Sequence, residues 1–305
     1  MLEEIIQSCC TGFGDCVTGY VSAYLFKKQI EKRYIHHEIR LSIAWLCVKC
    51  PYVKSEHLFH GPHRRRHMSN VNCLYSGIDG TQAFKDYFKS QRMLRDLNYS
   101  TQIKLIINQY VGKCFIDEGI SREEIKQLTY DAYHYFWEHV LDQEKIHKIT
   151  PSISLPIVDL TVVYVRVGDQ YLCQKQPPSD ALKECYQLLK DTLLNGPIAL
   201  IGDVDNPSMN EAFHSLYDLE TLKLASGSVS HSVGGSQMSL DEWAKVFADL
   251  ALILSAKNVF ILTNFSNFPR IVLFLKPFEQ VVVFKDNQLR TITDTSTFFA
   301  KHYNF

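Results

Sequence analysis

An arginine at the end of an apolar run is the first residue whose type and position suggest chemistry. Arg166 follows Val158–Val165, which has the length and composition of a buried strand. A guanidinium at this point is partly desolvated and stays protonated, and its planar fork of donors fits a phosphate or a carboxylate. An ion pair with Asp169, three residues later, is the structural alternative.

A second candidate is the segment Thr263–Arg270, which follows the apolar run Val259–Leu262. Its sequence is TNFSNFPR, and Pro269 suits the first turn of a helix. The N–H groups of a helix start lack partners inside the helix and attract anions. We therefore expect an anion-binding turn here, with an ordinary capped helix start as the alternative.

The third candidate is the loop GDVDNPS at 202–208, which follows the apolar run Ile198–Ile201. Asp203 and Asp205 form an Asp-x-Asp pair of the kind that binds Mg²⁺ or Mn²⁺. The same stretch is also ordinary turn and helix-capping sequence, because Asp, Asn, Pro and Ser favour both. We favour the turn and predict no bound metal.

The elements that must position these loops alternate along the second half of the chain. Strands are expected at 158–165, 198–201, 222–224, 259–262 and 281–284, and helices at 179–194, 208–216, 239–255 and 268–275. Such alternation predicts a parallel sheet with covered faces, which is a Rossmann-like domain. Ligands of these sheets bind beyond the carboxyl ends of the strands, where all three loops lie.

The first half is less regular, and we expect it to form a domain of its own. A length of 305 residues suits two domains, 1–150 and 151–305. The expected elements are a strand at 4–10, a turn at 12–14, a helix at 16–30, a strand or helix at 41–48, a cationic loop at 57–67, helices near 81–95 and 101–110, and a helix from a capping box at Ser121 to about Leu141.

The composition excludes several partners. A net charge of -1 gives no general attraction to nucleic acid or to anionic lipid, so an anion must be bound locally. No run approaches the ~18 apolar residues of a membrane helix, and the first residues are too short and acidic for a signal peptide. We expect a cytoplasmic protein whose cysteines, such as Cys47, Cys114 and Cys185, are reduced and buried.

Two other motifs are discounted. Gly12 and Gly14 suggest a dinucleotide fingerprint, but the third glycine, Gly19, lies too far along the chain. A zinc site is conceivable at a cluster comprising Cys47, Cys50, His57, His60, His63, His67 and Cys73. The arginines between these histidines would repel a cation, so the loop 60–67 more naturally faces an anionic or hydroxyl-rich ligand, or solvent.

Four segments together resemble the α-1,6-fucosyltransferase and nodulation-fucosyltransferase group. Leu250–Leu275 is similar to the last donor-binding motif of that group, with an apolar strand, a Ser-containing turn and an Arg-hydrophobic pair. Tyr164–Asp169 is similar to its His-x-Arg-Arg-x-Asp motif, Asp205–Ser208 to its Asp-Asp-Pro-Ser turn, and Cys10–Cys16 to its Cys-Gly-x-Gly-Cys loop. The segments occur in family order and cover residues 8–25 and about 158–285.

The resemblance implies a GT-B architecture, in which two Rossmann-like domains hold the donor in a cleft between them. It also implies inverting, metal-independent transfer of a sugar to a hydroxyl of a glycan or glycoprotein. No bound cofactor is implied. The co-substrate is a nucleotide sugar, with GDP-fucose favoured and a UDP-sugar, such as that of a xylosyltransferase, as the alternative.

Site residues follow from the resemblance by position. Arg166 would hold the β-phosphate of the donor, where charge develops as the glycosidic bond breaks, and would stabilise the transition state most. The implied donor-binding residues are Gly12, Phe13, Gly14, Tyr164, Asp205, Asp249, Phe265, Ser266, Asn267, Phe268 and Arg270.

The sequence departs from the family pattern at several positions. Tyr164 and Val167 replace a histidine and an arginine of the family. The family aspartate that reads guanine falls at Leu250 here, and the nearest aspartate, Asp249, lies one residue earlier. Gln174 occupies the position of the proposed catalytic glutamate, so Asp169 and Asp15 become the candidate general bases.

These departures leave two alternatives of other classes. One is a catalytically silent protein that binds a nucleotide sugar or a carbohydrate, which Gln174 motivates. The other is a metal-dependent Asp-x-Asp transferase with a single Rossmann domain. Golgi members of the group carry a membrane anchor and stem, whereas this chain begins close to its first strand, so we expect a bacterial or virus-encoded enzyme.

One further cluster is aromatic. Tyr130, Tyr133, Tyr135, Phe136 and Trp137 spread over several helical faces, so most of them are expected in the core. One exposed ring could stack on an acceptor sugar, but the sequence does not select which.

Overall fold

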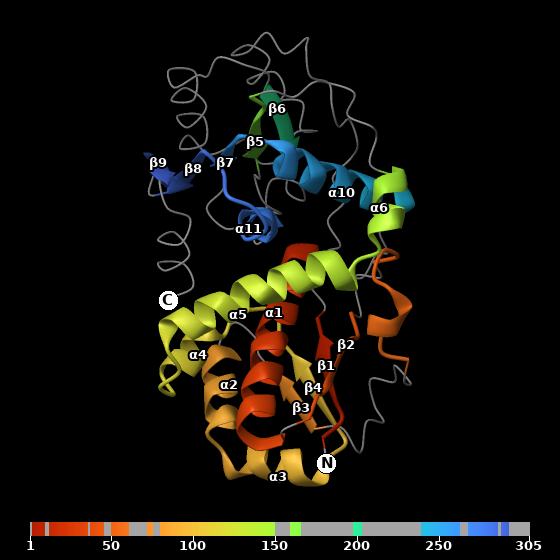
Figure 1. Ribbon diagram of the computed structural model, residues 1–305, viewed down its shortest axis with the longest axis vertical. Coiled ribbons are helices and arrows are strands. Elements are labelled where there is room, and N and C mark those ends of the chain that lie inside the picture. The colour runs from red at the N-terminus through yellow and green to blue at the C-terminus, as the bar shows by residue number, and fades with distance from the viewer. Residues whose placement is uncertain are drawn as a thin grey trace, which may run out of the picture. The chain divides into compact units, whose positions relative to one another are not determined.

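The computed structural model describes residues 2–9, 12–35, 37–45, 50–60, 72–75, 80–149, 159–165, 198–202, 239–262, 268–285 and 288–292. These residues divide into two compact units, one through Gln143 and the other from Glu144 onward. Each unit contains one sheet of mainly parallel strands (Figure 1). We call them unit 1 and unit 2.

Unit 1 contains a four-stranded parallel sheet in the order β2-β1-β4-β3. The strands are β1 (Glu4–Ser8), β2 (Arg40–Ile43), β3 (Asn72–Tyr75) and β4 (Gln102–Ile106). The helices are α1 (Phe13–Ile30), α2 (Gly80–Phe88), α3 (Gln91–Tyr99), α4 (Gly112–Ile116) and α5 (Arg122–Tyr135), with the short helical turns η1 (Glu31–Ile35), η2 (Ser55–His57) and η3 (Phe136–Val140). Helix α6 (Gln143–Ile149) follows.

The chain direction explains how the two faces of this sheet are covered. Helix α1 links β1 to β2, and α2 with α3 links β3 to β4, and both steps run the same way across the sheet. Right-handed crossovers therefore place these helices on one face, where Phe26 of α1 packs against Phe84 and Phe88 of α2. The step from β2 to β3 runs the opposite way, and Phe59, a described residue between these strands, packs on Ile6 and Ala44 on the other face.

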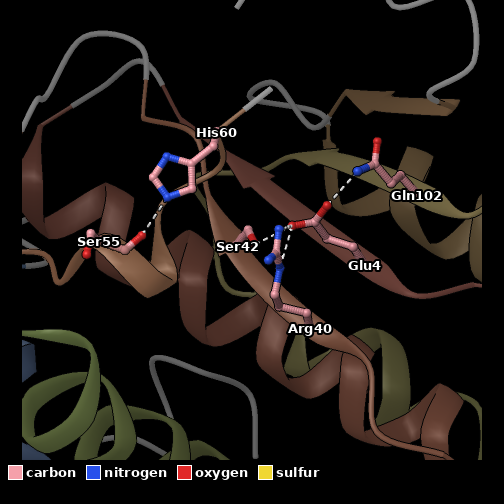
Figure 2. A network of polar contacts seen from close by, with 6 residues as sticks. All are labelled: Glu4, Arg40, Ser42, Ser55, His60 and Gln102. Atoms are coloured by element: carbon pink, nitrogen blue, oxygen red, sulfur yellow. Dashed lines mark hydrogen bonds and ion pairs between the residues drawn. The ribbon is translucent and has the colours of Figure 1, made fainter. Parts of the chain in front are cut away.

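The buried carboxylate of Glu4 links three strands on that second face by hydrogen bonds (Figure 2). Glu4 in β1 is 4% exposed and accepts hydrogen bonds from Arg40 Nε at 2.9 Å, from Ser42 Oγ and from Gln102 Nε2 at 2.6 Å. A buried charge is costly unless it is paired and hydrogen-bonded, and Glu4 meets both conditions. Glu4, Arg40 and Gln102 are the first residues of β1, β2 and β4, at the edge opposite the predicted ligand residues, so we assign the network to the scaffold.

Several expectations for unit 1 need correction. Residues 101–110 were expected to be helical but contain β4, and the helix expected at 81–95 is divided into α2 and α3. The ambiguous segment 41–48 begins with a strand. The capping box at Ser121 is half present: Ser121 accepts from the Glu124 amide, but the Glu124 carboxylate binds Gln29 and Lys32 instead of returning to Ser121.

Unit 2 contains a five-stranded sheet in the order β6-β5-β7-β8-β9. The strands are β5 (Thr161–Val165), β6 (Ile198–Gly202), β7 (Asn258–Leu262), β8 (Gln280–Lys285) and β9 (Gln288–Ile292), and the helices are α10 (Leu240–Ser255) and α11 (Phe268–Leu273). The first four strands are parallel, which confirms the predicted Rossmann-like sheet. Strand β9 was not predicted and pairs antiparallel with β8.

Local sequence accounts well for α10. Ser239 and Glu242 form a complete capping box at its start, and Trp243, Phe247 and Leu250 form part of its buried face. The expected helices at 179–194 and 208–216 and the expected strand at 222–224 lie outside the described residues. Within the described ranges, no helix combines the length and the apolar character needed to cross a bilayer.

The described cysteines agree in part with expectation. Cys9, Cys16, Cys50 and Cys114 are buried. Burial raises the pKa of the Cys50 thiol to about 12, and the pKa of Cys114 to about 11. Both thiols are therefore protonated at neutral pH and behave as small hydrophobic groups. Cys47 and Cys185 lie outside the described residues.

Candidate functional site

The carboxyl edge of the unit 2 sheet is where three predicted ligand loops begin. Strand β5 lies between β6 and β7, and Val165 is in register with Gly202 on one side and with Leu262 on the other. The chain therefore leaves these three strands at the same level of one edge. Arg166, Asp203 and Thr263 are the next residues of the sequence.

The strand order makes the gap between β5 and β7 a topological switch point. The next strand in sequence after β5 is β6 on one side, whereas β7 is followed by β8 on the other side. In open α/β sheets, ligands bind in the crevice that such a reversal creates beyond the strand ends. Arg166 directly follows β5 and residues 263–267 directly follow β7, so both predicted phosphate-binding segments begin at this point.

Many of the predicted site residues lie outside the described part of the chain. These are Arg166, Asp169, Asp205, Phe265, Ser266 and Asn267. Their strands and the helix after the turn are described, which fixes where each segment starts. Their roles remain predictions.

A ring contact joins the two sides of the switch point. Tyr164 is the penultimate residue of β5, and its ring stacks on that of Phe268, the first residue of α11. The ring centroids are 5.7 Å apart and the angle between the ring planes is 24°. Tyr164 is 4% exposed. The contact holds the end of β5 beside the start of α11, and both residues belong to the predicted donor-binding set.

Two other residues of unit 2 that are predicted to bind the sugar donor lie on helices. Asp249 is buried in α10, and its Oδ2 lies 3.4 Å from Nζ of Lys245, one turn earlier. Arg270 is the third residue of α11 and is partly exposed. Its position places a cation in the first turn of the helix that follows the Ser-bearing segment. The roles of Asp249 and Arg270 in binding a donor remain predictions.

The carboxyl edge of the unit 1 sheet contains the remaining predicted residues, Gly12, Phe13, Gly14 and Asp15. The segment 12–14 was expected to be a turn before a helix at Cys16, but α1 already begins at Phe13 with Gly12 as its N-cap. Gly12 has no side chain to cap the helix, and its φ of -63° and ψ of 164° are extended. The first-turn amides therefore keep their capacity for an anion.

The unit 1 edge is held together by buried polar side chains that sequence reasoning missed. Gln7 in β1 donates from Nε2 to the Ile107 carbonyl at 3.0 Å and accepts from Trp45 Nε1 through its Oε1. Trp45 follows β2 and meets Phe13 edge to face at 6.0 Å. These contacts fasten the ends of β2, β1 and β4 to the start of α1. A glutamine inside an apolar strand is the signal that could have revealed them.

One further polar group of this edge was missed. Asn108 follows β4, and its Oδ1 is buried with no hydrogen-bond partner in the part of the chain that the structure describes. A buried acceptor without a donor costs about 1–3 kcal/mol, so such an oxygen is suited to accept from a ligand or a water. Asn108 is therefore a candidate polar contact just beyond the carboxyl end of β4.

The proposed zinc cluster gains no support from the described residues. Among them, no three His, Cys, Asp or Glu side chains gather as a metal ion requires. His60 Nε2 lies 2.9 Å from the Ser55 carbonyl, which closes a local turn (Figure 2). Cys47, His63 and His67 lie outside the described ranges.

A surface hollow of about 650 Å³ lies at the opposite end of α1. It is lined by Lys28, Gln29, Glu31, Lys32, His37, Glu38, Glu124 and Leu128. Three carboxylates oppose the lysines, and Lys32 is already paired with Glu124 at 3.0 Å. This mixture of charges does not favour a diphosphate, so we do not assign the donor to it.

Comparison with known proteins supports the fold from an independent direction. No protein-family model matches the sequence, and no curated protein matches it either. Among solved structures, fucosyltransferase NodZ from Bradyrhizobium is 15% identical with a TM-score of 0.55, over 96% of this chain and 99% of that one. NodZ α-1,6-fucosyltransferase co-crystallized with GDP is 16% identical with a TM-score of 0.54, over 96% and 98%.

A plant enzyme gives the same result. A mutant of Arabidopsis thaliana FUT1 in complex with GDP is 11% identical with a TM-score of 0.56, over 94% of this chain and 72% of that one. The chain therefore has the GT-B fold of the fucosyltransferases. The resemblance inferred from four short motifs is confirmed at the level of the fold.

Proposed function

We propose that the protein is a glycosyltransferase that transfers a sugar from a nucleotide diphosphate to a glycan hydroxyl. Fucose is the favoured sugar and GDP the favoured nucleotide, because the structural neighbours are fucosyltransferases and two of the structures named above contain GDP. Unit 2 is proposed to bind the nucleotide sugar, and unit 1 to receive the acceptor.

One observation carries the proposal. Strands β5 and β7 are adjacent, parallel and in register at a topological switch point, and Tyr164 stacks on Phe268 across it. The residues that continue these strands are Arg166 and the hydroxyl- and amide-bearing turn 263–267. A guanidinium and a helix start brought to one crevice make a suitable site for a diphosphate.

The proposed mechanism is direct displacement with inversion. The acceptor oxygen attacks the anomeric carbon while the bond to the diphosphate breaks on the opposite side. Negative charge then grows on the departing diphosphate, and Arg166 with the amides of the 263–268 segment stabilises it more in the transition state than in the ground state. In unit 1, the first-turn amides of α1 after Gly12 are also suited to an anion.

Two carboxylates are the proposed candidates for the general base. Asp15 lies in the first turn of α1 and is partly exposed, so it can accept a proton from an acceptor hydroxyl. Asp169 follows Arg166 in the same loop. Replacing each by Asn and measuring transfer alongside hydrolysis of the donor identifies the base as the residue whose loss removes both.

The test of the function is a donor screen. Thermal unfolding is measured with GDP, UDP, dTDP and their sugars, because a ligand that binds the native state raises its stability by mass action. Release of nucleoside diphosphate is then measured with and without glycan acceptors, in EDTA and in Mg²⁺ or Mn²⁺. Binding and turnover that persist in EDTA support the proposal.

Three other outcomes separate the alternatives. Binding of a nucleotide without release of diphosphate indicates a silent binding protein, which Gln174 in place of a glutamate motivates. Loss of turnover in EDTA indicates a metal-dependent transferase. A response to UDP-sugars alone corrects the donor but keeps the scaffold and the reaction class.

A further inference from the structure

One ring of the aromatic cluster on α5 and η3 stands out by its exposure. Tyr133 and Phe136 are fully buried, whereas Tyr135 is 38% exposed. The Tyr135 ring is also held by neighbours, with centroids 5.8 Å from Tyr24, 6.2 Å from His57 and 4.9 Å from His139. We call these four residues the Tyr135 platform.

The platform differs from the other exposed aromatic side chains among the described residues. Tyr99 is 84% exposed at the end of α3, near the amino end of β4, and Tyr34 is 44% exposed in η1. Isolated exposed rings of this kind are normal on protein surfaces. A ring fixed by three other rings loses little freedom when a ligand stacks on it, so Tyr135 is preorganised for contact.

Charges of both signs surround the platform, since Lys28 Nζ lies 5.5 Å from the centroid of the Tyr24 ring. The pKa of Tyr24 is raised to about 12 by burial and next by the nearby Asp131 carboxylate. Glu138 of η3 lies one turn after His134 of α5, and its Oε1 is 3.2 Å from His134 Nδ1. Burial lowers the pKa of His57, so its imidazole is neutral near pH 7 and can donate or accept a hydrogen bond.

These properties match the two surfaces of a sugar ring. The C–H groups on one face of a pyranose pack against an aromatic ring, and its hydroxyls require neutral donors and acceptors at the rim. The Asp131 carboxylate offsets the Lys28 cation near Tyr24, so no excess of positive charge attracts a phosphate or a nucleic acid. A neutral oligosaccharide therefore fits the platform better than an anionic ligand does.

The location of the platform in unit 1 suggests which sugar it holds. Phe136, the next residue, packs on Phe13 and Trp45 at the carboxyl edge of the sheet. Tyr24 lies eleven positions beyond Phe13 on α1, which is about 16 Å along the helix axis. Tyr24, the residue of the platform on α1, thus lies about three helical turns beyond the start of that helix.

We propose that the Tyr135 platform binds a sugar ring of the acceptor glycan that is remote from the hydroxyl that reacts. As a role in the acceptor, this inference rests on the proposed glycosyltransferase function. As a carbohydrate-binding site, it is tested without any donor.

The experiment begins with binding. An array of neutral oligosaccharides is probed with wild type, with Tyr135→Ala, with Tyr135→Trp and with Tyr99→Ala as the matched exposed control. We expect wild type to bind at least one oligosaccharide, Tyr135→Ala to bind it at least tenfold more weakly, and the tryptophan and control variants to retain it. No bound oligosaccharide in wild type, or equal binding by Tyr135→Ala, overturns the proposal.

A kinetic experiment then compares two acceptors, the oligosaccharide found on the array and a monosaccharide. For the array oligosaccharide, Tyr135→Ala is expected to raise KM at least tenfold, with kcat and the KM for the donor unchanged. For a monosaccharide acceptor, KM is expected to stay the same. An equal rise for both lengths overturns the assignment to a remote sugar.

The two proposals fail in distinguishable ways. If no nucleotide sugar is bound or turned over while Tyr135→Ala still loses the oligosaccharide, the enzyme function fails and the carbohydrate site stands. If donors are turned over while Tyr135→Ala binds oligosaccharides normally, the platform fails and the function stands.

Discussion

The carboxyl edges of the two sheets are built in opposite ways. In unit 1, side chains of the strands and helices close the edge: Gln7 joins Trp45 to Ile107, and Ser22 Oγ of α1 donates to the Gln109 carbonyl at 2.6 Å. In unit 2, the residues at the ends of the strands are apolar, as Val165 and Leu262 are, and the polar residues come afterwards in the chain. The unit 1 edge therefore contains a packed polar network beside its predicted ligand residues, whereas the predicted ligand residues of unit 2 follow apolar strand ends.

This contrast predicts which mutations should affect stability and which should affect binding and turnover. Changes at Gln7, Trp45 or Gly19 of the unit 1 edge remove hydrogen bonds and packing from the folded state, so they should act mainly on stability. Changes in the segments after β5 and β7 should act mainly on binding and turnover. The four predictions below test that division.

The largest effect is expected at Arg166. Arg166→Ala should lower transfer by about 10³-fold, because it removes the cation on which the departing diphosphate depends. The unfolding temperature should stay within a degree or two of wild type. Arg33→Ala, at an exposed arginine of η1, is the control. Normal turnover by Arg166→Ala would count decisively against the donor site.

The next effect concerns two glycines of unit 1. A Cβ on Gly19 would overlap the Ile107 carbonyl oxygen and lie 2.7 Å from Gln7 Nε2, whereas a Cβ on Gly12 would have nothing within 4 Å. Gly19→Ala should therefore lower the free energy of unfolding by about 3 kcal/mol. Gly12→Ala should cost about 1 kcal/mol or less, since alanine is only a poorer N-cap. Equal urea midpoints for the two variants would show that the edge is not tightly packed.

A smaller effect is expected at the Tyr164–Phe268 stack. A double-mutant cycle with leucine at each position should give a coupling of about 1 kcal/mol in stability, as measured for aromatic pairs. Each single variant should also weaken GDP binding, because the contact holds the end of β5 beside the start of α11. Additive effects with unchanged GDP affinity would separate this pair from the donor site.

The smallest effect is a pH dependence of stability at His57. Burial lowers its pKa from 6.5, so the fold favours the neutral imidazole. The stability is in place above pH 6.5 and is lost as the pH falls through the lowered pKa. His57→Gln should therefore flatten the fall of the urea midpoint between pH 7 and pH 5, with His147→Gln on an exposed helix face as control. An unchanged slope would mean that His57 titrates alike in both states.

Elements with a strong local signal were predicted well. The capping box at Ser239 located the start of α10, and apolar runs located β1, β5, β6, β7 and β8 to within a few residues. The segment Gln102–Ile106 was mistaken for a helix because Lys, Leu, Ile and Gln are also common in helices. Its alternating burial and its pairing with β1 and β3 decide the matter.

Sequence patterns could not predict hydrogen bonds between side chains and partners that are distant in the sequence. Gln7 and Ile107 are 100 residues apart, and Glu124 binds Gln29 and Lys32 although its spacing from Ser121 favours a capping box. In each case a long-range partner competes with a local one, and only the packing of α1 against α5 and the sheet settles the outcome.

The sequence by itself determined the alternation of strands and helices in the second half and the polar loops that follow the strands, because periodicity and caps act over a few residues. The tertiary structure decided that β5, β6 and β7 are neighbours, that a switch point separates β5 from β7, and that Tyr135 is the exposed ring of its cluster. Strand order and exposure depend on which distant surfaces pack together, and no local pattern encodes that choice.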